Sequence, residues 1–585
     1  MPKSMQLLRL ASACVLSIMC GQAAAQAQAS VPRSQTLILA ARSTGPTFPG
    51  VGVANPYMAT EQTSVAPHLA QEALFYYNTF NGQMIPWQAT AAKYSDGFKT
   101  LRVSIRPRVT WSDGTLFSPE DVAFTLKLLR DNGNGKKDLK GAVAIAAAVK
   151  DAVVAGNDVV ITFNQPSPRF LLDQLVVMFG QGLTMLPAHV FKNVSDPGSF
   201  AYYDTAKGWP LTTGAYSLTR WTTTEIVLDR NDNWWGKKSG FRDLPAPRRV
   251  VAVPFNNPDR GAQLIQAGEA DTSRDLPVGV IRKLLEGNES ITTFSGKRSP
   301  FGNIDWWPIS LWFNNMSAPF DDARVRRAIS HSINRNQVVD FAFEGASDVS
   351  KGPYPAFGTL MKYIDASDTI AQAEGAITFD LAKTGKIMSD AGYQKNAAGF
   401  WAKNGQAIKS EIHSIGTLAE IGTIVAEQLR KAGFDVTFVQ AADSLPRIRD
   451  GRAQMMLWGH HSSIADPYAT LASYTCAQAR PIGTPIYPNF SRWCDQEFDK
   501  IVAKIGELPP EDHARIMPLF KQAMAIWYRQ TPEAPIVQWH HTVPLSTKYW
   551  RNWPTAGNPY IQPAFWLGTG PLVLHNLKPA PTEGK

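Results

Sequence analysis

Cysteine is scarce in this sequence, with four residues in 585. Cys14 and Cys20 lie in an N-terminal leader, so a processed chain keeps only Cys476 and Cys494. Two lone thiols offer little for a metal cluster or a redox centre, whereas an exported protein readily joins such a pair. We therefore predict one disulfide, Cys476–Cys494.

Long apolar runs are also missing, because no stretch approaches the roughly 20 residues that cross a membrane as a helix. The first 25 residues instead combine basic Lys3 and Arg9, a short apolar segment at residues 10–18 and small alanines at residues 23–25. This pattern predicts a secretory signal peptide over residues 1–25, cleaved near Ala25. The residues before Cys20 make a poor lipoprotein box, so we expect an exported soluble protein without a lipid anchor.

The sequence lacks the common catalytic signatures: it contains no nucleophile elbow, phosphate-binding loop, dinucleotide fingerprint or zinc-protease motif. Its only metal-like features are two histidine pairs, at residues 460–461 and 540–541. Adjacent residues on a strand point to opposite faces, so neither pair chelates well by itself. We expect no catalytic residue, no metal and no cofactor.

Charged residues make up 18% of the chain and hydrophobic ones 44%, which is typical of a folded protein. The formal net charge is +9, but the basic residues are scattered, and we expect no nucleic-acid partner. The length predicts two or three domains. The 17 tryptophans would fill cores or provide flat surfaces that grip a ligand.

Strand-like and helix-like patterns alternate irregularly, which favours an α/β or α+β architecture. Strands are expected at residues 36–40, 99–106, 158–163, 225–228 and 309–315. Ser118 and Pro119 predict the start of a helix. Asp113 lies in the turn before it, and we expect it to stabilise that turn and not to act as a catalytic acid. A second helix should start at Asp321 or Asp322, with Arg324, Arg326 and Arg327 on its solvated face.

A series of short segments resembles, in order, the large periplasmic solute-binding proteins of ABC importers known as solute-binding family 5. This family includes oligopeptide-, dipeptide-, nickel- and oligosaccharide-binding proteins. Together the segments extend over nearly all of the processed chain. They are WSDGT at residues 111–115 with SPEDV at 118–122, TGAY at 213–216, RNDNWW at 230–235, QAGEAD at 266–271, PFDDARVRRAI at 319–329, AGY at 391–393, DP at 466–467 and FD at 498–499.

The resemblance implies a bilobed α/β fold of the class II periplasmic-binding-protein type, with two hinge-crossing strands and an extra inserted domain, giving three lobes. Lobe I would combine residues 26–68, 206–308 and 537–585. Lobe II would be inserted at residues 69–205, and lobe III would span residues 309–536. A monomer in the periplasm would close on a small solute and present it to an ABC permease and its ATPase.

The resemblance leaves two ligand classes open, peptide-like or oligosaccharide. Peptide-binding members hold the ligand's ammonium with an acid shortly after a tryptophan. Here Trp458 and Pro467 match, but His461 stands at the acid's position and the loop is two residues longer. A buried ammonium without a carboxylate partner is costly, and Asp466 is expected to shape the turn beside Pro467.

Tryptophans near the inferred hinge would suit sugar rings, and residues 552–560 resemble a stretch of sugar-binding members. The ligand-contacting residues implied by the resemblance are Trp306, Trp307, Trp458, Trp539, Tyr57, His460, His461 and Asp466. The alternatives are an exported hydrolase or a chaperone that acts on the same ligand class.

Overall fold

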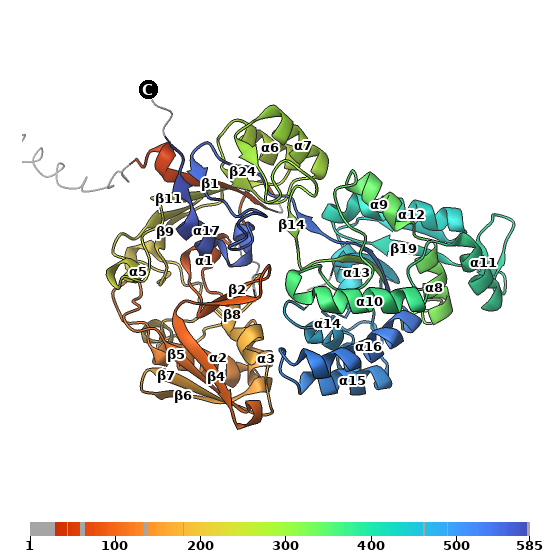
Figure 1. The fold of residues 1–585 in the computed structure, drawn as a ribbon, viewed down its shortest axis with the longest axis horizontal. Coiled ribbons are helices and arrows are strands. Elements are labelled where there is room, and N and C mark those ends of the chain that lie inside the picture. Colours follow the sequence, from red (N-terminus) through yellow and green to blue (C-terminus); the bar gives the residue numbers. More distant parts are fainter. Residues whose placement is uncertain are drawn as a thin grey trace, which may run out of the picture.

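The structure is a computed structural model that describes residues 30–43, 45–58, 65–133, 139–179, 181–459, 463–487 and 489–581. The chain forms two halves, and strand β14 lies where they meet (Figure 1). One half holds lobes I and II and the other holds lobe III, so the bilobed, three-lobed α/β fold is confirmed. The predicted signal peptide lies outside the described residues.

Lobe I is built on a sheet whose described strands follow the order β13-β24-β12-β1-β11-β10-β9. Its central pair is parallel, with Thr36 of β1 opposite Arg249 of β11. All the strands come from the three segments predicted for this lobe. They are β1 (Thr36–Arg42), β9 (Tyr216–Trp221), β10 (Ile226–Arg230), β11 (Arg249–Phe255), β12 (Thr272–Ser273), β13 (Ile291–Thr292) and β24 (Leu545–Ser546).

Helices and short C-terminal elements complete lobe I. Helices α6 and α7 form the top of the lobe in Figure 1 and pack on each other. The elements are α1 (Val65–Ala70), α5 (Trp235–Lys238), α6 (Pro258–Gln266), α7 (Val278–Gly287), η8 (Phe565–Leu567), α17 (Gly570–Asn576), β25 (Trp550–Arg551) and β26 (Lys578–Pro579).

Lobe II carries a four-stranded antiparallel sheet in the described chain, in the order β4-β5-β7-β6, and a smaller sheet β3-β2-β8. Helix α2 starts at Pro119, where the Ser118 backbone N–H donates to Asp121 Oδ2 at 2.9 Å, and Val122, Leu126 and Leu129 lie on its buried face. The elements are β2 (Phe75–Asn78), β3 (Gln83–Pro86), β4 (Ala89–Ser95), β5 (Thr100–Ile105), β6 (Val149–Ala155), β7 (Asp158–Phe163), β8 (Val176–Val177), α2 (Pro119–Asn132), α3 (Ala142–Ala148) and α4 (Ala188–Phe191).

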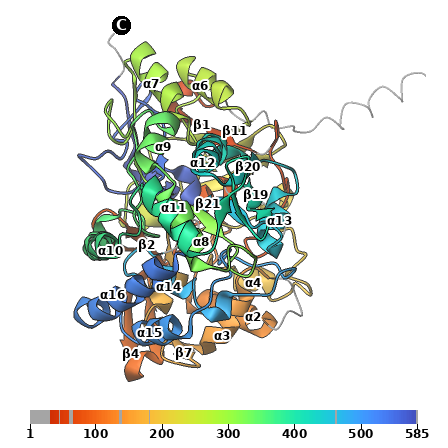
Figure 2. The same cartoon turned by 90° about the vertical axis from the view of Figure 1, so that its right-hand side faces the viewer.

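Lobe III contains a mixed sheet in the order β20-β19-β21-β15-β22, covered by helices that include α12 and α9 (Figure 2). The sheet strands are β15 (Ile309–Phe313), β19 (Lys409–His413), β20 (Asp435–Val439), β21 (Met455–Gly459) and β22 (Glu533–Val537). A separate small sheet holds β16 (Gln394–Lys395), β17 (Trp401–Lys403) and β18 (Gln406–Ala407). The helices are α8 (Ala323–His331), α9 (Arg335–Ala342), α10 (Met361–Ala373), α11 (Leu381–Asp390), α12 (Ala419–Ala432), α13 (Ser444–Asp450), α14 (Tyr468–Ala472), α15 (Gln496–Gly506) and α16 (His513–Gln530).

Two antiparallel segments connect lobe I with lobe III. Strands β14 (Asn303–Ile304) and β23 (His540–His541) pair between the lobes. The same two segments continue into β15 and β22, which pair in the sheet of lobe III. These are the two expected hinge-crossing strands, and they bring residues more than 200 positions apart to the junction of the lobes.

The local predictions for strands and helix starts are confirmed, and so is the disulfide Cys476–Cys494. Asp113 is a turn residue, since its carboxylate accepts from the Thr115 N–H at 2.9 Å. The predicted solvated face of α8 is wrong at Arg326, which is buried. Its guanidinium donates to the carbonyls of Phe320, at 2.7 Å, and Thr531, at 2.9 Å.

The burial of Arg326 has a local reason. Thr531 caps the C-terminus of α16, where helix carbonyls have no partner within the helix. A cation satisfies these carbonyls and complements the negative end of the helix dipole. Burial lowers the pKa of Arg326 to about 10, so the guanidinium remains charged at neutral pH.

Candidate functional site

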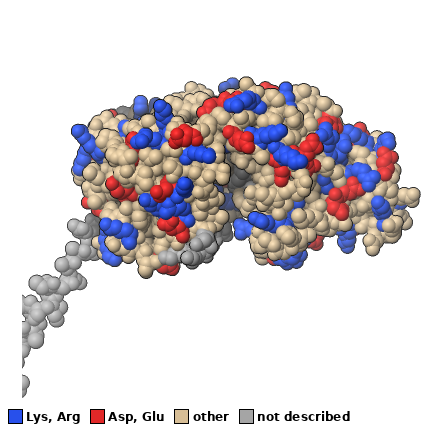
Figure 3. Space-filling model, turned by 90° about the horizontal axis from the view of Figure 1, so that it is seen from below, with Lys and Arg blue, Asp and Glu red and all other residues tan. Residues whose placement is uncertain are grey.

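A cleft between the lobes contains a cavity of about 650 Å³, here called the aromatic chamber. All three lobes and both crossing segments contribute to its wall. Its tryptophans are Trp306, Trp307, Trp539 and Trp566, and its polar residues include Arg42, Asn256, Arg274, Asp275, Asp305, Thr417 and His541. Viewed from below, the molecular surface is hollowed between the two halves, and its acidic and basic side chains are interspersed (Figure 3).

The tryptophans of the aromatic chamber are held in fixed orientations by neighbouring rings. Trp306 stacks on Phe179 of lobe II, with ring centroids 5.1 Å apart. Trp307 lies edge-on to Trp539 at 6.3 Å, and both rings are half-buried. A Cβ at Gly459 would lie 2.4 Å from Trp307, so only glycine lets this ring pack on β21. Each half-buried ring therefore keeps part of its surface accessible from the cleft.

A charged cluster joins the crossing segments to lobe I at the wall of this chamber. His541 Nδ1 lies 2.9 Å from Asp275 Oδ2, and His541 Nε2 lies 3.0 Å from Asp305 Oδ1. Burial alone would lower the pKa of His541, but the two carboxylates raise it to about 10. The imidazole is therefore doubly protonated at neutral pH, hydrogen-bonded through Nδ1 to Asp275 and ion-paired through Nε2 with Asp305.

A second cation, Arg274, lies beside this cluster and stacks on Trp566, which also lines the aromatic chamber. The Arg274 guanidinium lies 4.7 Å from the ring centroid of Trp566, whose ring also meets His541 edge-on at 5.3 Å. Burial lowers the pKa of Arg274, and the carboxylate of Asp275 opposes this shift. Charge, hydrogen-bond donors and aromatic faces thus lie within one cavity.

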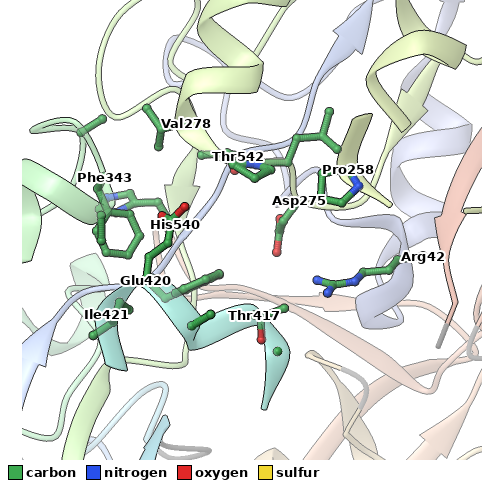
Figure 4. A pocket seen from close by; sticks show the side chains of 17 residues that line it. Arg42, Pro258, Asp275, Val278, Phe343, Thr417, Glu420, Ile421, His540 and Thr542 are labelled. Carbon is green, nitrogen blue, oxygen red and sulfur yellow. The ribbon is translucent and has the colours of Figure 1, made fainter. Parts of the chain in front are cut away.

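A second cavity of about 310 Å³ adjoins the first and is here called the apolar chamber (Figure 4). The two cavities share five lining residues, so they are two parts of one cleft. These are Arg42, Asp275, Gly416, Thr417 and Trp539. The remaining wall of the apolar chamber is mostly hydrocarbon, from Pro258, Leu276, Pro277, Val278, Ala342, Phe343, Ala346 and Ile421.

The predicted site residues fall into four groups. Trp306, Trp307 and Trp539 line the cleft. Trp458 lies behind it: the residue is 8% exposed, its ring meets that of Trp307 edge-on at 5.7 Å, and it lines neither chamber. The predicted contacts at His460 and His461 lie outside the described residues.

Two other predicted contacts are engaged within the protein. The Tyr57 hydroxyl donates to the Thr184 carbonyl at 2.6 Å, and Tyr57 is buried. Asp466 is also buried and accepts from Arg169 Nε at 2.9 Å. Neither side chain lines a chamber of the cleft, so a ligand-contacting role for these residues stays a prediction.

Sequence reasoning missed the charged residues of the cleft. Asp305 directly precedes the tryptophan pair at residues 306–307, and that position could have been noticed. Asp275 and His541 are separated by 266 residues, and no local pattern relates them. Among the described residues no cluster of three or more His, Cys, Asp or Glu side chains is arranged to hold a metal ion.

Comparisons with known proteins decide the family. The model of the bacterial extracellular solute-binding proteins, family 5, matches residues 83–480, more than half of the chain. The chain belongs to this family. Family 5 consists of binding proteins for transport. No helix in the described part of this family 5 protein is long and apolar enough to cross a membrane.

Curated relatives of this family 5 protein come from Escherichia coli K12. The nickel-binding periplasmic protein is 26% identical over 440 residues, covering 72% of this chain and 76% of that protein. The dipeptide-binding protein is 23% identical over 483 residues, covering 79% and 82%.

Solved structures show the same fold. A periplasmic oligopeptide-binding protein of an ABC transporter from Thermotoga maritima has a TM-score of 0.81 at 21% identity, over 94% of this chain and all of that one. A mannohexaose-bound structure of that transporter protein has a TM-score of 0.77 at 20% identity, over 94% and 99%.

Proposed function

We propose that this protein captures a short oligosaccharide in the periplasm and presents it to the permease and ATPase of an ABC importer. The sugar binds in the aromatic chamber, where it contacts both halves when the hinge closes. Because a ligand that contacts both halves binds the closed state better, it shifts the population toward closure. The permease then distinguishes the loaded protein from the empty one.

The observation that carries this proposal is the wall of four tryptophans around a charged, hydrogen-bonding cluster. The apolar faces of pyranose rings pack well against flat aromatic surfaces, and the half-buried Trp307 and Trp539 offer such surfaces. Sugar hydroxyls both donate and accept hydrogen bonds. The carboxylates of Asp275 and Asp305 supply acceptors, and the Arg42 guanidinium supplies donors.

A peptide is the second candidate, and one feature favours it. The Asp275–His541–Asp305 cluster carries two carboxylates against one imidazolium, and the surplus negative charge could pair with a ligand's ammonium. Against it, Asp466, the acid nearest the position used by peptide-binding relatives, is already paired with Arg169. The guanidiniums of Arg42 and Arg274 also offset the surplus charge near the chamber.

The relatives support both candidates. One structural neighbour is described with bound mannohexaose, and one curated relative is a dipeptide-binding protein. Calorimetric titration separates them: the purified protein is titrated with cello- and manno-oligosaccharides and with a mixture of di- to pentapeptides. We expect heat with a sugar and none with the peptides. Heat with peptides alone would contradict the oligosaccharide proposal.

The hydrolase alternative requires turnover. We expect an oligosaccharide incubated with the protein to be recovered unchanged, as judged by mass spectrometry. Shorter products formed by the wild type, but not by an Asp275→Asn variant, would replace the transport proposal with a hydrolytic one. A chaperone role would instead show as suppressed aggregation of an unfolded client protein.

A further inference from the structure

The apolar chamber differs in chemistry from the aromatic chamber beside it. Lobe I contributes Pro258, Leu276 and Val278, and lobe III contributes Ala342, Phe343 and Ile421. In Figure 4, Val278, Phe343 and Ile421 lie at one end of the chamber, and Arg42 and Asp275 lie toward the other. The polar end belongs to both chambers, so a ligand in the aromatic chamber can extend into the hydrocarbon end.

The crossing strand β23 contributes one residue to the wall of each chamber. His540 lines the apolar chamber, and its neighbour His541 lines the aromatic one, because successive side chains of a strand alternate in direction. Burial lowers the pKa of His540 to about 4, so this imidazole is neutral at pH 7. The adjacent imidazole of His541 is charged, so one strand presents a neutral wall to the first cavity and a cation to the second.

The apolar chamber is also formed between the lobes and not within one of them. Beside it, Arg282 of α7 pairs with Glu344, which follows α9, at 3.0 Å. The ring of Phe343 meets Trp539 edge-on, with centroids 5.8 Å apart. A group in this chamber would therefore contact both lobes in the closed state and add to the free energy of closure.

We infer that the natural ligand is an oligosaccharide that carries an uncharged apolar substituent, either an aromatic ring or a short acyl chain, and that this substituent occupies the apolar chamber. The inference rests on the function proposed above and narrows its substrate class. A volume of about 310 Å³ suffices, because an apolar cavity of about 150 Å³ already takes benzene. A negatively charged substituent would meet the carboxylate of Glu420, which lines the same chamber.

The test compares matched ligands: cellotriose and β-1,4-mannotriose, each free and as its 4-nitrophenyl β-glycoside, by calorimetric titration. For at least one sugar we expect the nitrophenyl glycoside to bind about tenfold or more tightly than the free trisaccharide. Two variants fill the chamber from opposite lobes, Ala342→Phe from lobe III and Val278→Phe from lobe I. Either should remove most of this gain and leave the affinity for the free sugar unchanged.

The control is Ala373→Phe, which adds the same ring at an exposed position at the end of α10. This variant should still bind the nitrophenyl glycoside more tightly than the free trisaccharide, by the same factor as the wild type. Melting curves show whether each variant is folded. Equal affinity for the free and substituted sugars would overturn the inference and leave the proposed function standing. A gain that survives both chamber-filling variants would overturn it too. If no sugar binds in either form, the proposed function fails and the inference falls with it.

Discussion

Arg169 of lobe II and Asp466 of lobe III form a buried ion pair between residues 297 positions apart. Two further donors of the guanidinium reach the carbonyls of Gly506 and Leu508, at 3.1 Å and 2.8 Å. The ring of Tyr468 lies 4.4 Å from the same guanidinium. All three nitrogens of the guanidinium are therefore engaged, and the pair links the two halves of the protein.

Asp466→Asn is predicted to destabilise the protein, because it leaves the Arg169 charge buried without its partner. Loss of one member of a buried pair costs about 3–5 kcal/mol. Urea unfolding would measure the free energy of unfolding. The control is Asp390→Asn, which breaks the exposed pair with Lys386 and should cost less than about 1 kcal/mol. Unchanged stability, with selective loss of peptide binding, would instead make Asp466 a ligand residue.

The ion pairs of His541 are predicted to make stability depend on pH. The pKa of this histidine in the folded protein, about 10, exceeds the value of 6.5 expected when unfolded. Its stabilising contribution is therefore complete below about pH 6.5 and is lost as the pH rises toward 10. The difference in the free energy of unfolding between wild type and His541→Gln should shrink over this range. A difference that stays constant from pH 6 to 10 would contradict the assignment.

The half-buried tryptophans of the aromatic chamber are predicted to carry sugar affinity. Trp307→Ala or Trp539→Ala should weaken oligosaccharide binding by about two- to tenfold, since losing a stacked aromatic contact costs about 0.5–1.5 kcal/mol. Titration calorimetry measures the change. Trp209→Ala is a suitable control, because this tryptophan is half-buried among Phe200 and Tyr202 and lines neither chamber. Equal losses in all three variants would indicate a general effect on folding.

The disulfide Cys476–Cys494 is predicted to stabilise lobe III without taking part in binding. Replacing both cysteines with serine should lower the free energy of unfolding by about 2–4 kcal/mol, because the open chain gains conformational entropy when unfolded. Neither cysteine lines a chamber, so ligand affinity should be unchanged. Melting curves with and without reductant, together with one titration, test both parts. Affinity that falls on reduction would mean that the loop shapes the cleft.

Local sequence patterns were enough to predict the starts of two helices, and the family motifs were enough to predict part of the cleft. Ser118 and Asp322 start helices α2 and α8 as predicted, because a side-chain or backbone cap depends only on residues a few positions apart. The family motifs implied the lobes and the crossing strands, and so placed Trp306, Trp307 and Trp539 at the cleft. The relation of these residues to the ligand remains a prediction.

The sequence alone determined the positions of the five predicted strands and the starts of the two predicted helices, which cysteines pair and which family the fold follows, because these depend on neighbouring residues or on ordered short motifs. Only the tertiary structure decided which charged side chains are buried and which histidine is protonated. Arg326 is buried because the end of α16 supplies its carbonyl partners, and His541 is charged because Asp275 and Asp305 reach it from distant segments. Electrostatic energy depends on distance in space and on burial, and neither can be read from separation along the chain.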